Sequence, residues 1–121
     1  MNTLIVAIVS IGLSVAAQFS LKAGMSSDSV RRVLYEPYTP ESLLKLATNR
    51  YILLGFFLYG LGAIVWLRVL SAWDVSKAYP LVGLGFALTV AIGFMRGEHV
   101  DMQRALGVAL IAAGVYMVGR S

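Results

Sequence analysis

Four long runs of apolar residues divide the chain, and short groups of polar and charged residues separate them. A helix of roughly 20 apolar residues crosses a hydrocarbon core of about 30 Å. We therefore predict an all-α membrane protein in which one domain, residues 1–121, contains four transmembrane helices. The predicted spans are about Thr3–Lys22, Tyr51–Leu70, Lys77–Met95 and Ala105–Gly119, the last extendable over Gln103 and Arg104.

The connection between the first two spans, residues 25–49, is the only long one. Within it, Thr39 suits the N-cap of a helix and Pro40 its first position. Leu43, Leu46 and Ala47 would then share one face. This pattern predicts a short helix lying in the membrane interface, although an extra turn at the start of the second span fits equally well. The other two connections are short enough for antiparallel hairpins: Ser71–Ser76 and Arg96–Gln103.

The composition excludes several classes of protein. Hydrophobic residues make up 59% of the chain and charged residues 13%, with a mean hydropathy of +0.79, whereas soluble domains are about 45–50% apolar. The net charge of +4 comes from residues that interrupt apolar runs rather than form a basic face, so a nucleic-acid partner is not expected. With no cysteine and one histidine, His99, neither a disulfide nor a metal site is expected. Since no nucleophile–base pair or phosphate-cradling loop occurs, we expect neither an enzyme nor a cofactor.

Basic residues flanking the spans indicate the orientation, because cytoplasmic loops carry an excess of Lys and Arg. The first and third connections hold six of them and the opposite side holds three, which predicts that both termini lie outside the cytoplasm. The two groups are Arg31, Arg32, Lys45, Arg50, Arg96 and Arg104, and Arg68, Lys77 and Arg120.

Polar residues form a stripe along the first span, since Ser10, Ser14, Gln18 and Lys22 recur every four positions. A charge at membrane depth costs about 2.5–3.5 kcal/mol on insertion scales, which makes a substrate contact plausible for Lys22. The alternative is that the serines and Gln18 bond between helices and Lys22 extends to the headgroups.

The second span combines glycines with large rings on one face: Gly55, Tyr59, Gly62 and Trp66. Such a face can form a groove with aromatic walls that accepts a chain or a sugar. Alternatively, it packs closely against another helix, and the aromatic rings fill the space between the two helices. Arg68 closes the span, where its guanidinium suits either a phosphate or an ordinary interfacial anchor.

The third span carries Lys77 and Tyr79 immediately before Pro80, followed by Gly83 and Gly85. Proline removes an amide donor and glycines permit bending, so we predict a kink, a substrate contact at Lys77 and Tyr79, and a hinge at Pro80, Gly83 and Gly85. Alternatively, Pro80 is only a first-turn residue.

The fourth span has Gly107 and Gly114 on one face among small neighbours, with Ile111 between them. Small residues let helices approach closely, which favours an oligomer interface at these three positions.

All six acidic residues fall outside the hydrophobic spans: Asp28, Glu36, Glu41, Asp74, Glu98 and Asp101. Exchange of protons for lipophilic cations would ordinarily need a buried carboxylate. A site of cations, amides and hydroxyls suits an anion instead, and a phosphate on a long lipid would leave its tail in the bilayer.

The order of motifs resembles the small multidrug resistance branch of the drug/metabolite transporter superfamily. The resemblance rests on four short spans, Ala78-Tyr79, and the run from Gly107 to Val115. Within that branch, Leu13–Gln18, Ile52–Trp66 and Ser76–Tyr79 more closely resemble subunits of the undecaprenyl-phosphate-aminoarabinose flippase. Drug exporters of the branch carry an essential glutamate where this chain has Ser14, which argues against proton-coupled efflux.

The resemblance implies a multi-pass protein of the bacterial inner membrane that acts as a homodimer or as a heterodimer with a similar subunit. We predict a flippase that translocates a polyprenyl-phosphate-linked sugar, or the polyprenyl-phosphate lipid itself, between leaflets in contact with membrane lipids. Lys22, Lys77 and Arg68 would neutralise the phosphate; Ser14, Gln18 and Tyr79 would bond the headgroup; Tyr59 and Trp66 would wall the groove. The alternatives are efflux of organic cations and a non-transporting assembly subunit.

Overall fold

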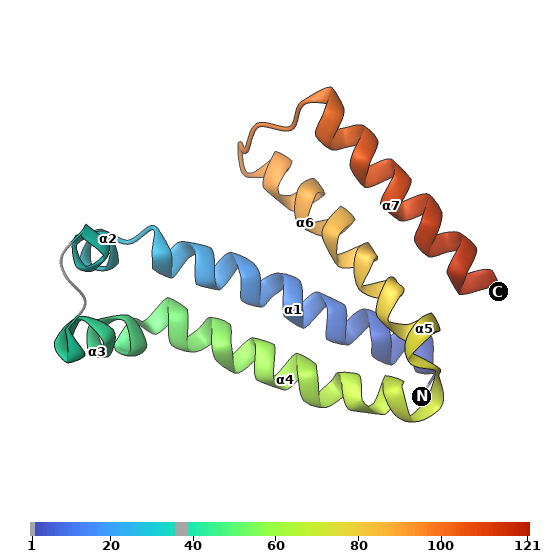
Figure 1. Ribbon diagram of the computed structural model, residues 1–121, viewed down its shortest axis with the longest axis horizontal. Coiled ribbons are helices and arrows are strands. Elements are labelled where there is room, and N and C mark those ends of the chain that lie inside the picture. The colour runs from blue at the N-terminus through green and yellow to red at the C-terminus, as the bar shows by residue number, and fades with distance from the viewer. Residues whose placement is uncertain (1, 36–38) are drawn as a thin grey trace.

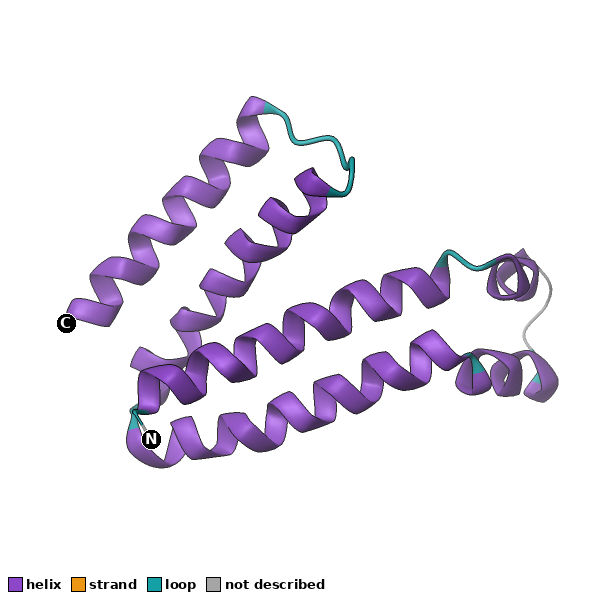
Figure 2. Cartoon of the chain, turned by 180° about the vertical axis from the view of Figure 1, so that it is seen from behind, coloured by secondary structure: helices purple, strands orange, loops and turns teal. Residues whose placement is uncertain are grey.

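The computed structural model describes residues 2–35 and 39–121, which form helices joined by short loops (Figures 1 and 2). Within this part of the chain, four helical segments are long and apolar enough to cross a membrane, which confirms the four predicted spans. In chain order the elements are α1 (Thr3–Met25), α2 (Asp28–Tyr35), α3 (Pro40–Thr48), α4 (Arg50–Ala72), α5 (Val75–Ala78), the 3₁₀ turn η1 (Tyr79–Val82), α6 (Gly83–Met95) and α7 (Met102–Arg120). The fourth span does include Gln103 and Arg104.

Helices α1 and α4 lie antiparallel and side by side along their whole length (Figure 1). Their backbones approach closely where α4 has glycine: a Cβ built on Gly62 would lie 3.2 Å from the Ser10 carbonyl oxygen and 3.3 Å from the Leu13 Cβ. The Ser10 hydroxyl also donates to the Gly62 carbonyl at 2.6 Å. Since helices in lipid gain little from the hydrophobic effect, close packing and such bonds hold this pair together.

The third span is interrupted, as its proline suggested. Helix α5 gives way to the 3₁₀ turn η1, in which Pro80 occupies one of the first two positions, and α6 begins at Gly83. A 3₁₀ segment within a span marks a local change of helical winding. The 3₁₀ turn lies where the sequence predicts a kink, while the kink itself and the hinge role of Pro80, Gly83 and Gly85 stay predictions.

The α6–α7 hairpin leaves the α1–α4 hairpin at an angle, so that α1 and α6 diverge away from α5 (Figure 1). The buried core lies where the two hairpins meet, close to the end of the molecule that holds both termini. It consists of Val6, Ala7, Ile11, Val15, Val69, Ala78, Leu81 and Val115.

The long connection folds into two helices rather than one. Helix α3 starts as predicted, because the Thr39 hydroxyl accepts the Ser42 amide at 3.1 Å and Pro40 follows. Asn49 then adopts an extended conformation and its side chain caps α4, so α3 is a separate helix and the extra-turn interpretation was wrong. Its location in the membrane interface stays a prediction.

Helix α2 was missed in the sequence. It buries Val30 and Val33 and exposes Arg31 and Arg32. It has only eight residues, and charged side chains interrupt its few apolar ones, so it gives no long apolar period to recognise. Residues 36–38 of this connection, Glu36 and Pro37 among them, lie outside the described residues.

Candidate functional site

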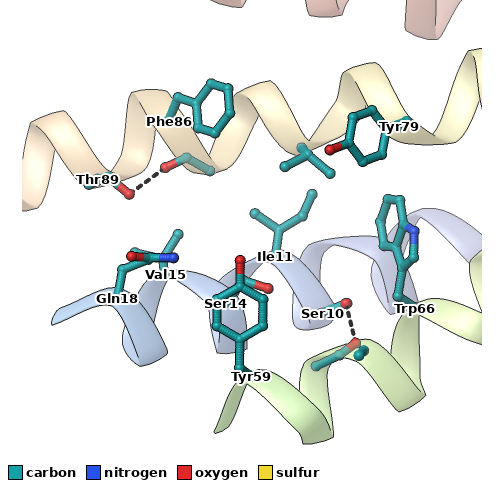
Figure 3. Close-up of a pocket in the computed structure, with 14 residues that line it drawn as sticks. Ser10, Ile11, Ser14, Val15, Gln18, Tyr59, Trp66, Tyr79, Phe86 and Thr89 are labelled. Atoms are coloured by element: carbon teal, nitrogen blue, oxygen red, sulfur yellow. Dashed lines mark hydrogen bonds between the residues drawn. The ribbon is translucent and has the colours of Figure 1, made fainter. Parts of the chain in front are cut away.

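A pocket of about 340 Å³ lies between α1, α4, η1 and α6, within the membrane-spanning part of the molecule (Figure 3). That volume falls within the range of about 300–1,000 Å³ typical of small-molecule sites. Its lining is Ser10, Ile11, Ser14, Val15, Gln18, Tyr59, Gly62, Ala63, Trp66, Tyr79, Val82, Gly85, Phe86 and Thr89.

The lining combines aromatic rings, hydroxyls and one amide, and none of these described residues carries a charge. Figure 3 places Gln18 and Thr89 at one end and Trp66 and Tyr79 at the other, with Ser14 and Tyr59 between them. Such a surface can bond neutral polar groups and stack on flat or apolar ones, but it offers no counter-charge to an ion.

Five of the eight residues predicted to bind substrate meet at this pocket. They are Ser14 and Gln18 from α1, Tyr59 and Trp66 from α4, and Tyr79 from η1. Their convergence supports the grouping made from helical spacing, and binding itself stays a prediction.

The three predicted cations lie outside the lining. Lys22 and Arg68 are exposed. Lys77 is half-buried, with its ammonium 4.8 Å from the centre of the Trp73 ring. If these cations act on a phosphate, they therefore do so beside the pocket and not within it.

Ser10, the first member of the α1 stripe, has a structural bond. It is buried and donates to the Gly62 carbonyl, so the interpretation of a bond between helices is confirmed for this residue. Ser14 and Gln18, which follow it on the same face, contribute to the pocket.

The lining also includes residues that the sequence did not single out, among them Val82 from η1 and Phe86 and Thr89 from α6. The Thr89 hydroxyl donates to the Gly85 carbonyl of its own helix at 2.7 Å. Because α6 is apolar on all sides, its pattern does not indicate which face turns inward. Thr89 was the only usable signal, as the one hydroxyl residue in α6.

The predicted oligomer residues lie on α7, most of which is exposed. A Cβ built on Gly107 or Gly114 would meet nothing within 4 Å. Ile111 is 39% exposed and touches the edge of α6, where its Cγ2 would lie 2.9 Å from a Cβ on Gly83. The interface itself stays a prediction.

Comparison with known proteins identifies the family. A probable 4-amino-4-deoxy-L-arabinose-phosphoundecaprenol flippase subunit ArnE of Pseudomonas savastanoi pv. phaseolicola is 42% identical over 79 residues, which is 64% of this chain and 69% of the relative. A protein of the same description from Pseudomonas fluorescens is 38% identical over 82 residues, covering 67% of this chain and 72% of the relative. The chain belongs to the ArnE flippase-subunit family.

A more distant ArnE, from Pectobacterium atrosepticum, is 34% identical over 80 residues, 65% of this chain and 71% of the relative. No family model and no solved structure matches the chain. Membership of the ArnE family confirms the resemblance found in the sequence. Together with the four spans it makes this chain a multi-pass membrane protein of a flippase family, and the relatives' names describe transporter subunits.

Proposed function

We propose that this chain is a subunit of a bacterial inner-membrane flippase that moves a polyprenyl-phosphate-linked sugar between leaflets. The observation that carries the proposal is the uncharged, aromatic and hydroxyl-lined pocket at membrane depth in a member of the ArnE family. The relatives are named for a phosphoundecaprenol carrying 4-amino-4-deoxy-L-arabinose, and this chain takes the same chemical class of substrate.

The pocket receives the sugar. Its hydroxyls bond Ser14, Gln18 and Tyr59, and its apolar face stacks on Trp66 and Tyr79. Moving unpaired hydroxyls through hydrocarbon costs several kcal/mol, of order 2–7 for each group, so supplying partners in the pocket lowers the barrier. The prenyl tail stays in the lipid, where it has no such cost.

The cations beside the pocket neutralise the phosphate, which the lining cannot do. Lys22 lies beyond the Gln18 end of the pocket, while Lys77 lies near the Tyr79 end and Arg68 two residues after Trp66. Two cationic ends separated by a neutral pocket let the phosphate leave one side and be received at the other.

The working unit is a dimer formed through Gly107, Ile111 and Gly114 of α7, with a second copy or a similar subunit as partner. Rocking of the subunits about Pro80, Gly83 and Gly85 exposes the pocket to each side in turn. The excess of basic residues puts both termini outside the cytoplasm.

The test is transfer of a fluorescent polyprenyl-phosphate-linked sugar in proteoliposomes that contain this chain, with and without its candidate partner subunit. We expect Lys22→Ala and Lys77→Ala each to slow transfer at least tenfold, and Tyr59→Ala with Trp66→Ala to abolish it. Arg120→Ala is the matched control, because that cation lies against Tyr116 of its own helix. Unchanged transfer in both lysine variants would refute the assigned roles.

Efflux of organic cations is the second candidate, since aromatic walls also attract cations. It requires a carboxylate, and neither Asp74 nor Glu98 is among the described residues that line the pocket. Resistance conferred by this chain alone, and lost in Asp74→Asn or Glu98→Gln, would favour efflux over lipid transfer.

A further inference from the structure

Two cations, Lys22 and Arg96, follow the Gln18 end of the pocket along the two helices that form that end. Gln18 lies on α1, and Lys22 follows one helical turn later on the same face. Thr89 lies on α6, and Arg96 follows two turns later as the C-cap of that helix. Along their own helices, both cations therefore come after the residues that form the Gln18–Thr89 end, which Figure 3 labels.

The Arg96 side chain reaches from α6 to α1. Its guanidinium carbon lies 5.7 Å from the centre of the Phe19 ring, and Phe19 is the neighbour of Gln18 in α1. It does so although α1 and α6 diverge toward this end (Figure 1). The guanidinium thus reaches from the end of α6 to a ring of α1.

This contact differs from those of the other described arginines over rings. Arg50 lies over its own neighbour Tyr51, and Arg120 lies over Tyr116 one turn before it in the same helix. Those side chains fold along their own helix, as interfacial anchors do. Arg96 instead joins two helices, which is a geometry expected for a group that helps to shape a site.

We propose that Arg96 and Lys22 form a phosphate-binding mouth to the pocket, in which Arg96 is a binding residue that the sequence did not reveal. The inference rests on the proposed function and names how its substrate is held. The pocket carries no charge for a phosphate, so a lipid-linked sugar seated in it must find its counter-charge at an end. Guanidinium stacks on an aromatic ring while it donates two parallel bonds to phosphate oxygens, which suits Arg96 to this position.

The mouth also accounts for the direction of the lipid tail. With the sugar near Ser14 and the phosphate between Lys22 and Arg96, the prenyl chain leaves the protein where α1 and α6 diverge (Figure 1). At the other end Lys77 rests on Trp73 much as Arg96 rests on Phe19, but an ammonium offers the phosphate a point charge and not a fork of parallel donors. We therefore expect the phosphate to bind more strongly at the Lys22–Arg96 end of the pocket than at the Lys77 end.

Lipid binding to the full-length chain, purified and in nanodiscs, tests this assignment. Trp66 fluorescence is the reporter inside the pocket, and Trp73→Phe is present throughout because the chain has two tryptophans. The probes are a polyprenyl phosphate, the uncharged polyprenol of equal length, phosphatidylglycerol, and inorganic phosphate as a competitor. We expect the unsubstituted chain to prefer the polyprenyl phosphate over the polyprenol. Arg96→Gln and Lys22→Gln should each reduce that preference about tenfold, as the loss of one charged hydrogen bond does.

Three further variants separate phosphate binding from general effects. Arg96→Lys keeps the charge but loses the fork, so we expect a smaller loss than in Arg96→Gln. Phe19→Leu removes the ring that holds the guanidinium and should weaken phosphate binding without affecting the polyprenol. Arg32→Gln removes an exposed cation of α2, and we expect no change.

The outcomes divide cleanly between the two proposals. Three results would overturn the proposed phosphate-binding mouth. Arg96→Gln could weaken binding of the polyprenyl phosphate and of the polyprenol equally, or Arg32→Gln could reduce the preference as much as Arg96→Gln does. Phosphatidylglycerol or inorganic phosphate could also bind as well as the polyprenyl phosphate. The mouth would also be overturned if Arg96→Gln and Lys22→Gln both kept the preference for polyprenyl phosphate over polyprenol. The proposed function could still stand in that case, provided that lipid transfer continues. Failure of the proposed function looks different: the unsubstituted chain, with or without its partner subunit, would move no lipid-linked sugar.

Discussion

Gly55 and Gly62 of α4 have the same helical spacing as Gly107 and Gly114 of α7, but the two pairs have opposite surroundings. In α4, a Cβ on Gly55 would lie 2.6 Å from Leu21 side-chain carbons, and one on Gly62 3.2 Å from the Ser10 carbonyl. In α7, a Cβ on Gly107 or Gly114 would meet nothing within 4 Å. One set of glycines is covered by α1, and the other faces outward from the chain.

The difference shows what a row of small residues can reveal. Such a row allows the backbone of another helix to approach, but it does not say which helix. For α4 the neighbour lies in the same chain, and the contact positions Tyr59 and Trp66 beside the α1 stripe. For α7 the uncovered face leaves room for a second subunit, as the proposed dimer requires.

The largest effect should come from filling the α1–α4 contact. Gly62→Leu puts a side chain against the Ser10 carbonyl and Leu13, where neither backbone nor Cβ can move away cheaply. Overpacking of this kind costs about 1–3 kcal/mol, and the same side chain also enters the pocket. We expect the apparent melting temperature in detergent to fall by several degrees and lipid transfer to stop.

Gly60→Leu is the matched control for that variant. Gly60 lies two positions earlier in α4, and a Cβ there meets nothing within 4 Å. Its melting temperature should equal that of the unsubstituted chain or rise slightly, since Leu has the higher helix propensity. Equal destabilisation by both variants would show that the α1–α4 contact is not the cause.

Gly114→Leu should separate association from folding. A Cβ at this position meets no atom of another helix within 4 Å, so we expect the melting temperature of the monomer not to fall. A helix packed on this face would be pushed away, and we expect dimerisation to weaken about tenfold, or about 1.4 kcal/mol. Fluorescence energy transfer between labelled chains in detergent measures this, first without and then with the partner subunit.

Gly119→Leu provides the comparison on α7, because Gly119 is also open but lies on a different face from Gly107 and Gly114. It should leave association unchanged. If both leucine variants associate as strongly as the unsubstituted chain, the proposed α7 interface is wrong.

The spans and α3 could be predicted because their signals are local. A run of about 20 apolar residues determines a span by length alone, and Thr39 with Pro40 starts a helix through bonds within its first turn. Helix α2 could not be predicted in this way, because Val30 and Val33 are buried by contacts outside the helix.

The site was predictable where a helix has one polar face. Apolar residues surround the polar face of α1 and the glycine–aromatic face of α4. The sequence therefore groups Ser14 with Gln18, and Tyr59 with Trp66, as neighbours on one face of a helix. The rotation of α6 was not predictable from its uniform apolar pattern, so Thr89 was missed. Nor could spacing show that Arg96 would lie over Phe19, since that contact depends on how α6 crosses α1.

Gly83→Ala tests a glycine with a third kind of surroundings: a Cβ there meets neither backbone, as on Gly62, nor empty space, as on Gly114, but only the ends of side chains. A Cβ there would lie 2.8 Å from the Val115 Cγ2 and 2.9 Å from the Ile111 Cγ2, which are side-chain ends on α7. We expect a loss of stability of about 1 kcal/mol, at the low end of overpacking. Val115→Ala should relieve it, so the double variant should be more stable than the sum of the single changes predicts. Strict additivity in that cycle would contradict the contact.

The smallest effect should come from the hydroxyl that bridges α1 and α4. Ser10→Ala removes its bond to the Gly62 carbonyl, but that carbonyl keeps its bond within α4, so no buried acceptor is left unpaired. Hydrogen bonds between membrane helices average about 0.6 kcal/mol, and we expect a loss of that size in unfolding measurements. Thr89→Val removes a hydroxyl that bonds only within α6 and should cost less. If Ser10→Ala cost no more than Thr89→Val, the α1–α4 contact would depend on its glycines and not on this bond.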